Sequence, residues 1–316
     1  METAAVGAVR VTRLALGCAP LAGLYEPVSD DAAQQALAAA WDAGIRTFDT
    51  APLYGLGVSE RRLGAALARW PREEIALCTK VGRVLEPRTG PASESSRQFP
   101  GAPPLEPRFD FSRDGVLRSF EASLERLGVE RVDIVHIHDP DDHMEVALGE
   151  AYPALEELRA QGLVRAIGAG MNQAPALTRF VRETDVDCVL LAGRYTLLDR
   201  SALADLLPAC ERRGVAVIAG AVLNSGILAG GGRYDYAPAP PELAARARRQ
   251  AAICERHGVP LTAAALQFPL SHPAVACVLV GARSAAEVEQ DARLFARPIP
   301  DALWEELSAA EAGAAR

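Results

Sequence analysis

The sequence lacks long apolar runs, an excess of positive charge and a targeting segment. These are the features of membrane-spanning, nucleic-acid-binding and exported proteins. No run approaches the roughly 20 apolar residues of a membrane-spanning helix, and residues 1–10 have no signal-peptide core. Acidic residues outnumber basic ones, 41 to 33, which gives a net charge of -8. This balance argues against nucleic acid or a membrane surface as the main partner, and we expect a cytoplasmic protein.

Cysteine is present, but not at the spacing of a disulfide framework or a zinc site. No C-x-x-C pair occurs, and the six cysteines are widely separated: Cys18, Cys78, Cys188, Cys210, Cys254 and Cys277. This pattern is typical of small apolar residues in a reducing cytoplasm.

Lysine is almost absent. Of 33 lysine and arginine residues only Lys80 is a lysine, and it stands at the end of the apolar run 75–80. A compact ammonium whose pKa responds to burial is what arginine does not supply. A single lysine must fall somewhere, so chance is the alternative interpretation. Strand ends are, however, where α/β enzymes place their chemistry, and we favour a functional Lys80.

The sequence does contain a regular alternation of short apolar runs and amphipathic helical stretches. Predicted strands span residues 13–17, 47–49, 75–80, 132–138, 164–170, 188–192, 215–219 and 275–280. Predicted helices span 31–43, 59–70, 113–127, 145–161, 174–182, 202–213 and 241–257. This pattern predicts one α/β domain over residues 1–316, a (β/α)8 TIM barrel. An open doubly wound sheet is less favoured, because no G-x-G-x-x-G follows the first strand.

Two long segments interrupt the alternation. Residues 82–108 are rich in Pro, Ser and Gly, and residues 230–241 in Gly, Pro and Tyr. Such long loops in a compact domain are usually lids or insertions. Both follow strand ends, so we expect them on the C-terminal face of the barrel, where active sites of this fold are built.

Four polar residues stand at or just beyond predicted strand ends: Asp49, Tyr54, Lys80 and His138. Asp49 closes an apolar run and needs a partner in the barrel mouth, and Lys80 ends the next strand. A free phenol titrates near ~10, but a nearby ammonium lowers its pKa. The pattern predicts that Asp49 holds Lys80 and that Lys80 makes Tyr54 a tunable acid or base.

Each of these residues also has a structural interpretation: Asp49 as a helix cap, Tyr54 as a packed aromatic, His138 as a core histidine. Their convergence on one face of a barrel favours catalysis. His136 and His138 share a strand face, and His138 is nearer the strand end, so we assign His138 to the site and His136 to the interior. No further ligands stand at usable spacing, so we expect no metal, and the absence of G-x-S-x-G argues against a nucleophilic serine.

The block Gly-Ile-Arg-Thr-Phe-Asp-Thr-Ala-Pro-Leu-Tyr-Gly at residues 44–55, with the Ser-Glu pair that follows it, resembles the signature of the aldo/keto reductase superfamily. The likeness extends over nearly the whole chain and implies an NAD(P)-dependent barrel. It matches Asp49, Tyr54, Lys80 and His138 to the catalytic tetrad of that family. Tyr54 would be the proton donor or acceptor and Lys80 would lower its pKa. Asp49 would hold Lys80, and His138 would orient the substrate oxygen.

The same resemblance implies a set of residues for NADP or NAD. Asn172 would bind the nicotinamide amide, the run 224–228 would lie beside the pyrophosphate, and the run 281–284 would hold the adenosine phosphate. A helix N-terminus that begins with glycine and carries an arginine can bind an anion on physical grounds alone. The alternative interpretation of Arg283 is an ordinary surface charge at the start of a helix. The implied residues are Asn172, Asn224, Ser225, Gly226, Leu228, Gly281, Arg283, Ser284 and Glu287.

Three departures from the family's usual residues narrow the resemblance to one branch of the family. Ala192 replaces an expected glutamine, Gly220 a nicotinamide-stacking tyrosine, and Asp291 an asparagine near the adenine. With the run 192–198, they resemble the branch that includes L-fucose dehydrogenase, D-threo-aldose 1-dehydrogenase, L-galactose dehydrogenase and pyridoxal 4-dehydrogenase. That branch oxidises a cyclic hemiacetal to a lactone. The resemblance implies oxidation of an aldose such as L-fucose, D-arabinose or L-galactose at C1, or of pyridoxal.

Several alternatives stay open at this point. An NADPH-dependent aldehyde or ketone reductase would use the same four residues in reverse, and Arg283 mildly favours NADP. A cofactor-binding regulatory subunit is the non-enzymatic alternative, and a lyase or isomerase lacks a phosphate or metal site. We expect Tyr25, Phe109, Phe111 and the long segment 82–108 to form the walls of the substrate pocket. Their mixed aromatic and polar character does not distinguish a sugar from a pyridine. We also expect a small-molecule substrate and a monomer or small homo-oligomer.

Overall fold

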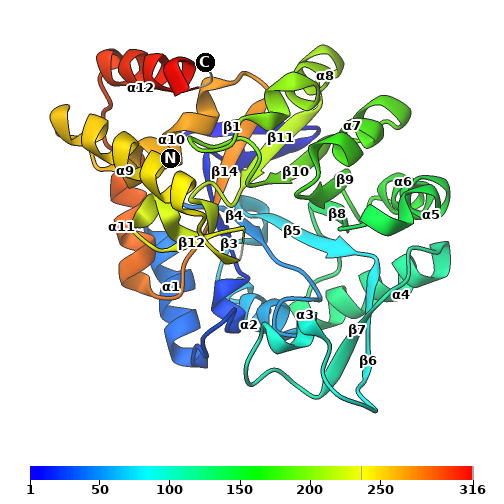
Figure 1. Cartoon of the computed structure of the whole chain (residues 1–316). Helices are drawn as coiled ribbons and strands as arrows, with labels where there is room; N and C mark the ends of the chain where they lie inside the picture. Colours follow the sequence, from blue (N-terminus) through cyan, green and yellow to red (C-terminus); the bar gives the residue numbers. More distant parts are fainter. Residues whose placement is uncertain (236, 315–316) are drawn as a thin grey trace.

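A closed barrel of eight parallel strands forms the centre of the molecule (Figure 1). We describe it from a computed structural model, which describes residues 1–235 and 237–314. The strands are β3 (Leu14–Gly17), β4 (Thr47–Asp49), β5 (Ala76–Val81), β8 (Ile134–His138), β9 (Ala166–Met171), β10 (Cys188–Ala192), β11 (Ala216–Gly220) and β14 (Val275–Gly281). They pair in this order, and β14 closes the barrel on β3. The predicted (β/α)8 barrel is confirmed.

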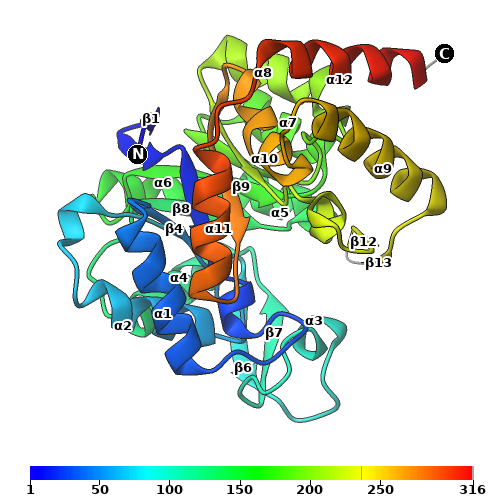
Figure 2. The same cartoon turned by 90° about the vertical axis from the view of Figure 1, so that its left-hand side faces the viewer.

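Helices surround the barrel (Figures 1 and 2). They are α1 (Asp30–Asp42), α2 (Val58–Leu67), α4 (Arg113–Leu127), α5 (Met144–Val146), α6 (Tyr152–Ala160), α7 (Ala174–Glu183), α8 (Leu206–Arg213), α9 (Pro241–Arg256), α10 (Leu261–Gln267), α11 (Ala285–Phe295) and α12 (Asp301–Ala314). No helix in the part of the chain that the structure describes is both long enough and apolar enough to span a membrane.

Local sequence explains where these helices start and which face they bury. The Ser29 hydroxyl accepts the Ala32 N–H at the start of α1, the N-capping contact that serine favours. Ala33, Ala36 and Leu37 then recur at helical spacing and are buried. The predicted helix 202–213 starts later than expected, at Leu206, because residues 201–204 form a 3-10 turn instead.

Small apolar side chains fill the N-terminal half of the barrel. All six cysteines are free and buried, and three of them, Cys78, Cys188 and Cys277, belong to this inner cluster. A hairpin that the sequence analysis did not predict, β1 (Thr3–Val6) with β2 (Val9–Thr12), adds valines to the same cluster. Its strands are only four residues long, too short for a clear alternating pattern.

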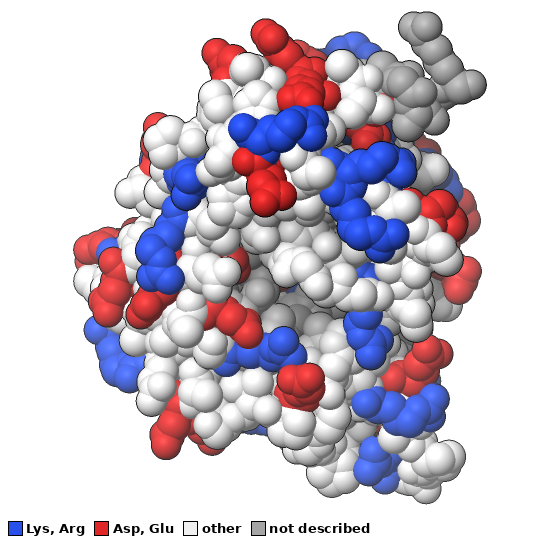
Figure 3. All heavy atoms as spheres, turned by 60° about the vertical axis from the view of Figure 1, so that its left-hand side comes forward, with Lys and Arg blue, Asp and Glu red and all other residues white. Residues whose placement is uncertain are grey.

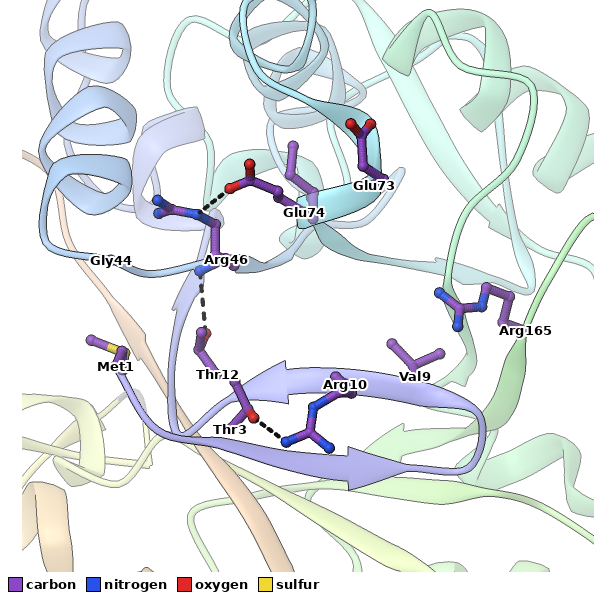
Figure 4. Close-up of a pocket in the computed structure, with 11 residues that line it drawn as sticks. Met1, Thr3, Val9, Arg10, Thr12, Gly44, Arg46, Glu73, Glu74 and Arg165 are labelled. Atoms are coloured by element: carbon purple, nitrogen blue, oxygen red, sulfur yellow. Dashed lines mark hydrogen bonds and ion pairs between the residues drawn. The ribbon is translucent and has the colours of Figure 1, made fainter.

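The hairpin borders a cavity of about 550 Å³ (Figure 4). Figure 4 shows Arg10 on the hairpin and Arg46 with Glu74 on the opposite side. Arg10 donates to Thr3, and Arg46 pairs with Glu74 at 3.5 Å. None of the predicted catalytic residues lines this cavity, so we place no chemistry there.

The two long segments expected to be loops contain secondary structure. In the first, β6 (Arg83–Pro87) pairs antiparallel with β7 (Leu105–Phe109), and α3 (Glu94–Arg97) lies between them. The sequence pattern did not reveal this hairpin, because residues 88–104 between its two strands are rich in proline, serine and glycine. In the second, β12 (Arg233–Tyr234) pairs with β13 (Ala237–Pro238). Figure 2 shows β1 on one side of the barrel and α3, β12 and β13 on the other.

Candidate active site

A buried ion pair joins the ends of β4 and β5. Lys80 Nζ lies 2.6 Å from Asp49 Oδ2 and donates a second hydrogen bond, at 2.9 Å, to the carbonyl of Thr50. The side chains of Lys80 and Asp49 are 2% and 4% exposed. Burial disfavours the charged amine, but the carboxylate of Asp49 and then Tyr54 outweigh it, so the pKa of Lys80 is raised. The ammonium is therefore retained at neutral pH.

Tyr54 lies beside this ammonium. Lys80 Nζ is 4.6 Å from the centroid of the Tyr54 ring. The turn that carries Tyr54 needs Gly55 next to it, because Gly55 has φ +61° and a Cβ there would lie 2.8 Å from Ala22 Cβ. The Phe99 ring, from the segment between β6 and β7, packs 6.5 Å from the Tyr54 ring.

The pKa of Tyr54 differs from the sequence-based expectation. Lys80 acts in the expected direction and lowers it, but burial acts more strongly and raises the pKa of Tyr54 to about 12. The expected net lowering was therefore wrong for the protein by itself. The sequence placed the ammonium beside the phenol but did not show how deeply both are buried. At neutral pH Tyr54 is a protonated phenol that can donate.

His138 completes the group from the end of β8. Its ring lies 5.9 Å from the Tyr54 ring, edge to face. Burial, and then the charges of Arg83 and Lys80, hold the pKa of His138 well below its usual value, so the imidazole is neutral. His136 lies deeper, fully buried, with Nε2 3.5 Å from the Cys188 Sγ.

Tyr54, Lys80 and His138 line one cavity of about 480 Å³. Asn172 also lines it, and its amide donates to the carbonyl of Ala192 at 3.2 Å. The segment 82–108, which was expected to form a pocket wall, contributes Arg83, Glu94, Ser95, Gln98 and Phe99. Asp139 and Asp235 also line the cavity, and the sequence analysis did not assign either to the site. Most of these lining residues come from the two hairpins, and Arg83 stood unmarked among many arginines. Outside that segment, Asp139 had a visible signal, its place next to His138.

The three aromatic residues predicted as pocket walls lie elsewhere. Tyr25 lines a neighbouring cleft rather than this cavity. Phe109 is 45% exposed and packs against Arg83, and Phe111 is buried over Gly82. The reason is the β6–β7 pairing, which turns residues 109–111 toward the hairpin. Phe99, in the same segment, lines the cavity instead.

The neighbouring cleft has a volume of about 560 Å³ and shares Leu24 with the first cavity, so the two adjoin. Figure 3 shows a hollow on the surface with basic and acidic side chains around it. The cleft is lined by five of the residues expected at the cofactor: Ser225, Gly226, Gly281, Arg283 and Glu287. Gly281 is constrained, because a Cβ there would lie 2.7 Å from Pro20 Cγ. A cleft that adjoins the cavity of the ion pair is where a cofactor next to a substrate would be held.

Three other expected cofactor residues, Asn224, Leu228 and Ser284, do not line the cleft. Asn224 is buried and its amide donates to the carbonyl of Gly193 at 3.3 Å. Leu228 belongs to an apolar cluster, and the Ser284 hydroxyl accepts the Glu287 N–H at the start of α11. Ala221, Asn224 and Ser225 all have positive φ, a conformation that costs energy outside glycine and is often found at ligand sites.

Asp291 lies one helical turn after Glu287 in α11. Burial, and then Glu287, raises the pKa of Asp291 from 3.8 to about 6. Because the folded-state pKa is the higher one, the stability contributed by the protonated form is complete below the unfolded value and is lost as pH rises through 6. We expect Asp291→Asn to raise the free energy of unfolding by about 1 kcal/mol at pH 7.5 and to have little effect at pH 3.5. Urea denaturation at both pH values measures this, and a loss of stability at pH 7.5 would contradict it.

Comparison with known proteins agrees with this fold. A model of the aldo/keto reductase family matches residues 13–312. The chain is 45% identical over 316 residues to D-threo-aldose 1-dehydrogenase of a Pseudomonas species, covering 97% of this chain and 96% of that protein. It is 42% identical over 321 residues to pyridoxal 4-dehydrogenase of Microbacterium luteolum, covering 93% and 92%. A solved glycerol dehydrogenase of Gluconobacter oxydans aligns with a TM-score of 0.78 and 25% identity, covering 97% and 94%.

Fold and site thus define a barrel oxidoreductase with a nicotinamide cofactor. The chain belongs to the aldo/keto reductase family. The family resemblance inferred from residues 44–60 is confirmed, and the protein is an enzyme that acts on a small molecule.

Proposed function

We propose that the enzyme oxidises the anomeric carbon of a cyclic aldose to a lactone. The near full-length likeness to D-threo-aldose 1-dehydrogenase carries this proposal. The geometry supports it, because a phenol, an ammonium and a neutral imidazole converge on one cavity next to a second cleft. When bound, the nicotinamide cofactor accepts the hydride.

Within this proposal the chain's own residues handle the proton and the oxygen. Tyr54 exchanges a proton with the anomeric hydroxyl at its phenolic oxygen, and the neutral His138 ring orients that hydroxyl. Lys80 favours the phenolate relative to burial alone, and Asp49 keeps the ammonium in place. Ser225, Gly226, Gly281, Arg283 and Glu287 would hold the cofactor.

The charges at the far end of the cleft favour NAD over NADP. The Arg283 guanidinium already pairs with Glu26 at 2.8 Å and lies 3.8 Å from Glu287. Two carboxylates therefore compete with any phosphate for this guanidinium, and each would repel a 2′-phosphate. Carboxylates accept hydrogen bonds from a ribose hydroxyl, as in other NAD sites.

A second candidate is oxidation of pyridoxal in its hemiacetal form, which the likeness to pyridoxal 4-dehydrogenase favours. The reaction is the same at the reacting carbon, and only the rest of the substrate differs. The arrangement of Tyr54 and His138 therefore does not distinguish the two substrates, and an activity assay has to do so.

Steady-state assays of the wild-type enzyme test the function and the cofactor together. L-fucose, D-arabinose, L-galactose and pyridoxal are each supplied with NAD and with NADP, and p-nitrobenzaldehyde is supplied with NADPH. We expect an aldose to be oxidised with a kcat/KM at least about 10-fold higher with NAD, which is about 1.4 kcal/mol. Turnover of p-nitrobenzaldehyde alone would instead show a reductase. Cofactor binding without any turnover would show a regulatory subunit.

A further inference from the structure

The cavity that Tyr54 lines also holds an ion pair that the proposed reaction does not use. Arg83 Nη2 lies 2.9 Å from Asp139 Oδ2, and both residues line the cavity. The Arg83 side chain is only 8% exposed. Buried charged groups are expensive, so a pair in a cavity wall calls for an explanation.

Arg83 is held in place through both its side chain and its backbone. Its Cζ lies 4.3 Å from the centroid of the Phe109 ring, a cation–π contact. The Ser119 hydroxyl donates to the Arg83 carbonyl at 3.0 Å. Gly82 has φ +96°, and a Cβ there would lie 2.2 Å from Phe111. The guanidinium is therefore positioned before any substrate arrives.

One donor of this rigid guanidinium lacks an acceptor. Arg83 Nε is buried and has no hydrogen-bond partner among the residues that the structure describes. Native proteins rarely leave a buried donor unpaired, so a bound molecule or water is the expected acceptor. The fixed fork of arginine suits two acceptors side by side.

Asp139 supplies the matching acceptor next to the reacting groups. Its backbone N–H donates to the Gly170 carbonyl at 3.0 Å, with φ +47° at Asp139. Its Oδ2 lies 3.4 Å from His138 Nε2. The carboxylate therefore lies between Arg83 and the His138 imidazole, to which the proposed function assigns the reacting hydroxyl. It is placed to meet groups on the ring carbons next to the reacting one.

We propose that Arg83 and Asp139 form a recognition pair for two neighbouring hydroxyl groups on the ring of a neutral aldose. Each hydroxyl can accept from the guanidinium and donate to the carboxylate, so the pair fits a vicinal diol. Leu24, Leu53 and Phe99 line the same cavity and offer apolar contact to the carbon face of the ring. This inference rests on the proposed function and assigns its substrate specificity.

The charge of the cavity argues for a neutral sugar rather than a sugar phosphate. Lys80 is neutralised by Asp49, and Arg83 by Asp139. Glu94 and Asp235 also line the cavity, and Asp235 is paired with Arg194 at 2.8 Å. A phosphate would meet carboxylates without a free cation to bind it.

The test compares a hemiacetal that carries further ring hydroxyls with one that carries none. One is the aldose that the wild-type enzyme oxidises best, and the other is tetrahydropyran-2-ol, which has the reacting hydroxyl and no other. We expect Arg83→Met to lower kcat/KM for the aldose by roughly 50-fold, mainly through KM, and to change that for tetrahydropyran-2-ol by less than about 3-fold. Asp139→Asn should lower the aldose value in the same selective way.

Arg108→Met is the matched control. Arg108 lies on the same hairpin, is 71% exposed and pairs only with Glu86, so both rates should stay at the wild-type value. Equal losses with both hemiacetals in Arg83→Met would overturn the recognition pair while leaving the proposed function intact. No oxidation of either hemiacetal by the wild-type enzyme would instead remove the proposed function, and the recognition pair with it. If Arg83→Met does not fold, Arg83→Lys keeps the charge without the fork, and it should show the same selective loss.

Discussion

Tyr54→Phe is expected to lower kcat for aldose oxidation by roughly 1,000-fold, the range that a positioned acid or base contributes. The substitution removes one oxygen and leaves the ring packed on Phe99 and beside Lys80. The cofactor cleft does not include Tyr54, so NAD affinity, measured by fluorescence quenching, should be unchanged.

A matched control separates loss of the hydroxyl from loss of a tyrosine. The Tyr152 hydroxyl donates to Glu156 in α6, outside both cavities. Tyr152→Phe should keep wild-type turnover. Full turnover in Tyr54→Phe would refute the assigned role of the phenol.

The pH profile follows from the same residue. Burial raises the pKa of Tyr54 to about 12. At any pH below that value, the phenolate fraction therefore increases about 10-fold for each unit by which the pH is raised. The wild-type oxidation rate should therefore rise through the neutral and alkaline range. Tyr54→Phe should have a profile without this rise.

Lys80→Met is expected to abolish turnover and also to destabilise the fold. It leaves the Asp49 carboxylate buried without its partner at 2.6 Å. Removing one member of a buried pair costs about 3–5 kcal/mol. It also removes the charge that favours the Tyr54 phenolate. Steady-state assay and urea denaturation measure the two effects separately.

The double variant Asp49→Asn/Lys80→Met distinguishes stability from catalysis. With both charges gone, most of the lost stability should return, because no unpaired charge is left in the interior. Turnover should stay absent, since the phenol still lacks its ammonium. Recovery of turnover together with stability would show that Lys80 only supports the fold.

Much of the fold could be predicted from local patterns. Each barrel strand is a short apolar run followed by an amphipathic helix, and that order alone implies a parallel barrel. Because parallel strands end on one face, Asp49, Lys80 and His138 could be placed near one another before any coordinates. The antiparallel pairs β1–β2 and β6–β7 could not, since pairing between short strands depends on contacts rather than on period.

The substrate side of the cavity was least accessible from the sequence. Arg83 is one of many arginines, and nothing in the sequence connects it with Asp139. The β6–β7 hairpin brings the guanidinium to the carboxylate. Aromatic residues suggested pocket walls, but the pairing of Arg83 with Phe109 directs Phe109 toward the guanidinium instead.

The amino-acid sequence by itself determined the barrel, the family and the four polar residues at its mouth, because strand period and strand ends are local properties. The tertiary structure alone decided how strongly those residues are buried, and hence that the phenol of Tyr54 stays protonated at neutral pH. It also decided which side chains face the substrate, because burial and the meeting of distant segments arise only when the chain closes on itself.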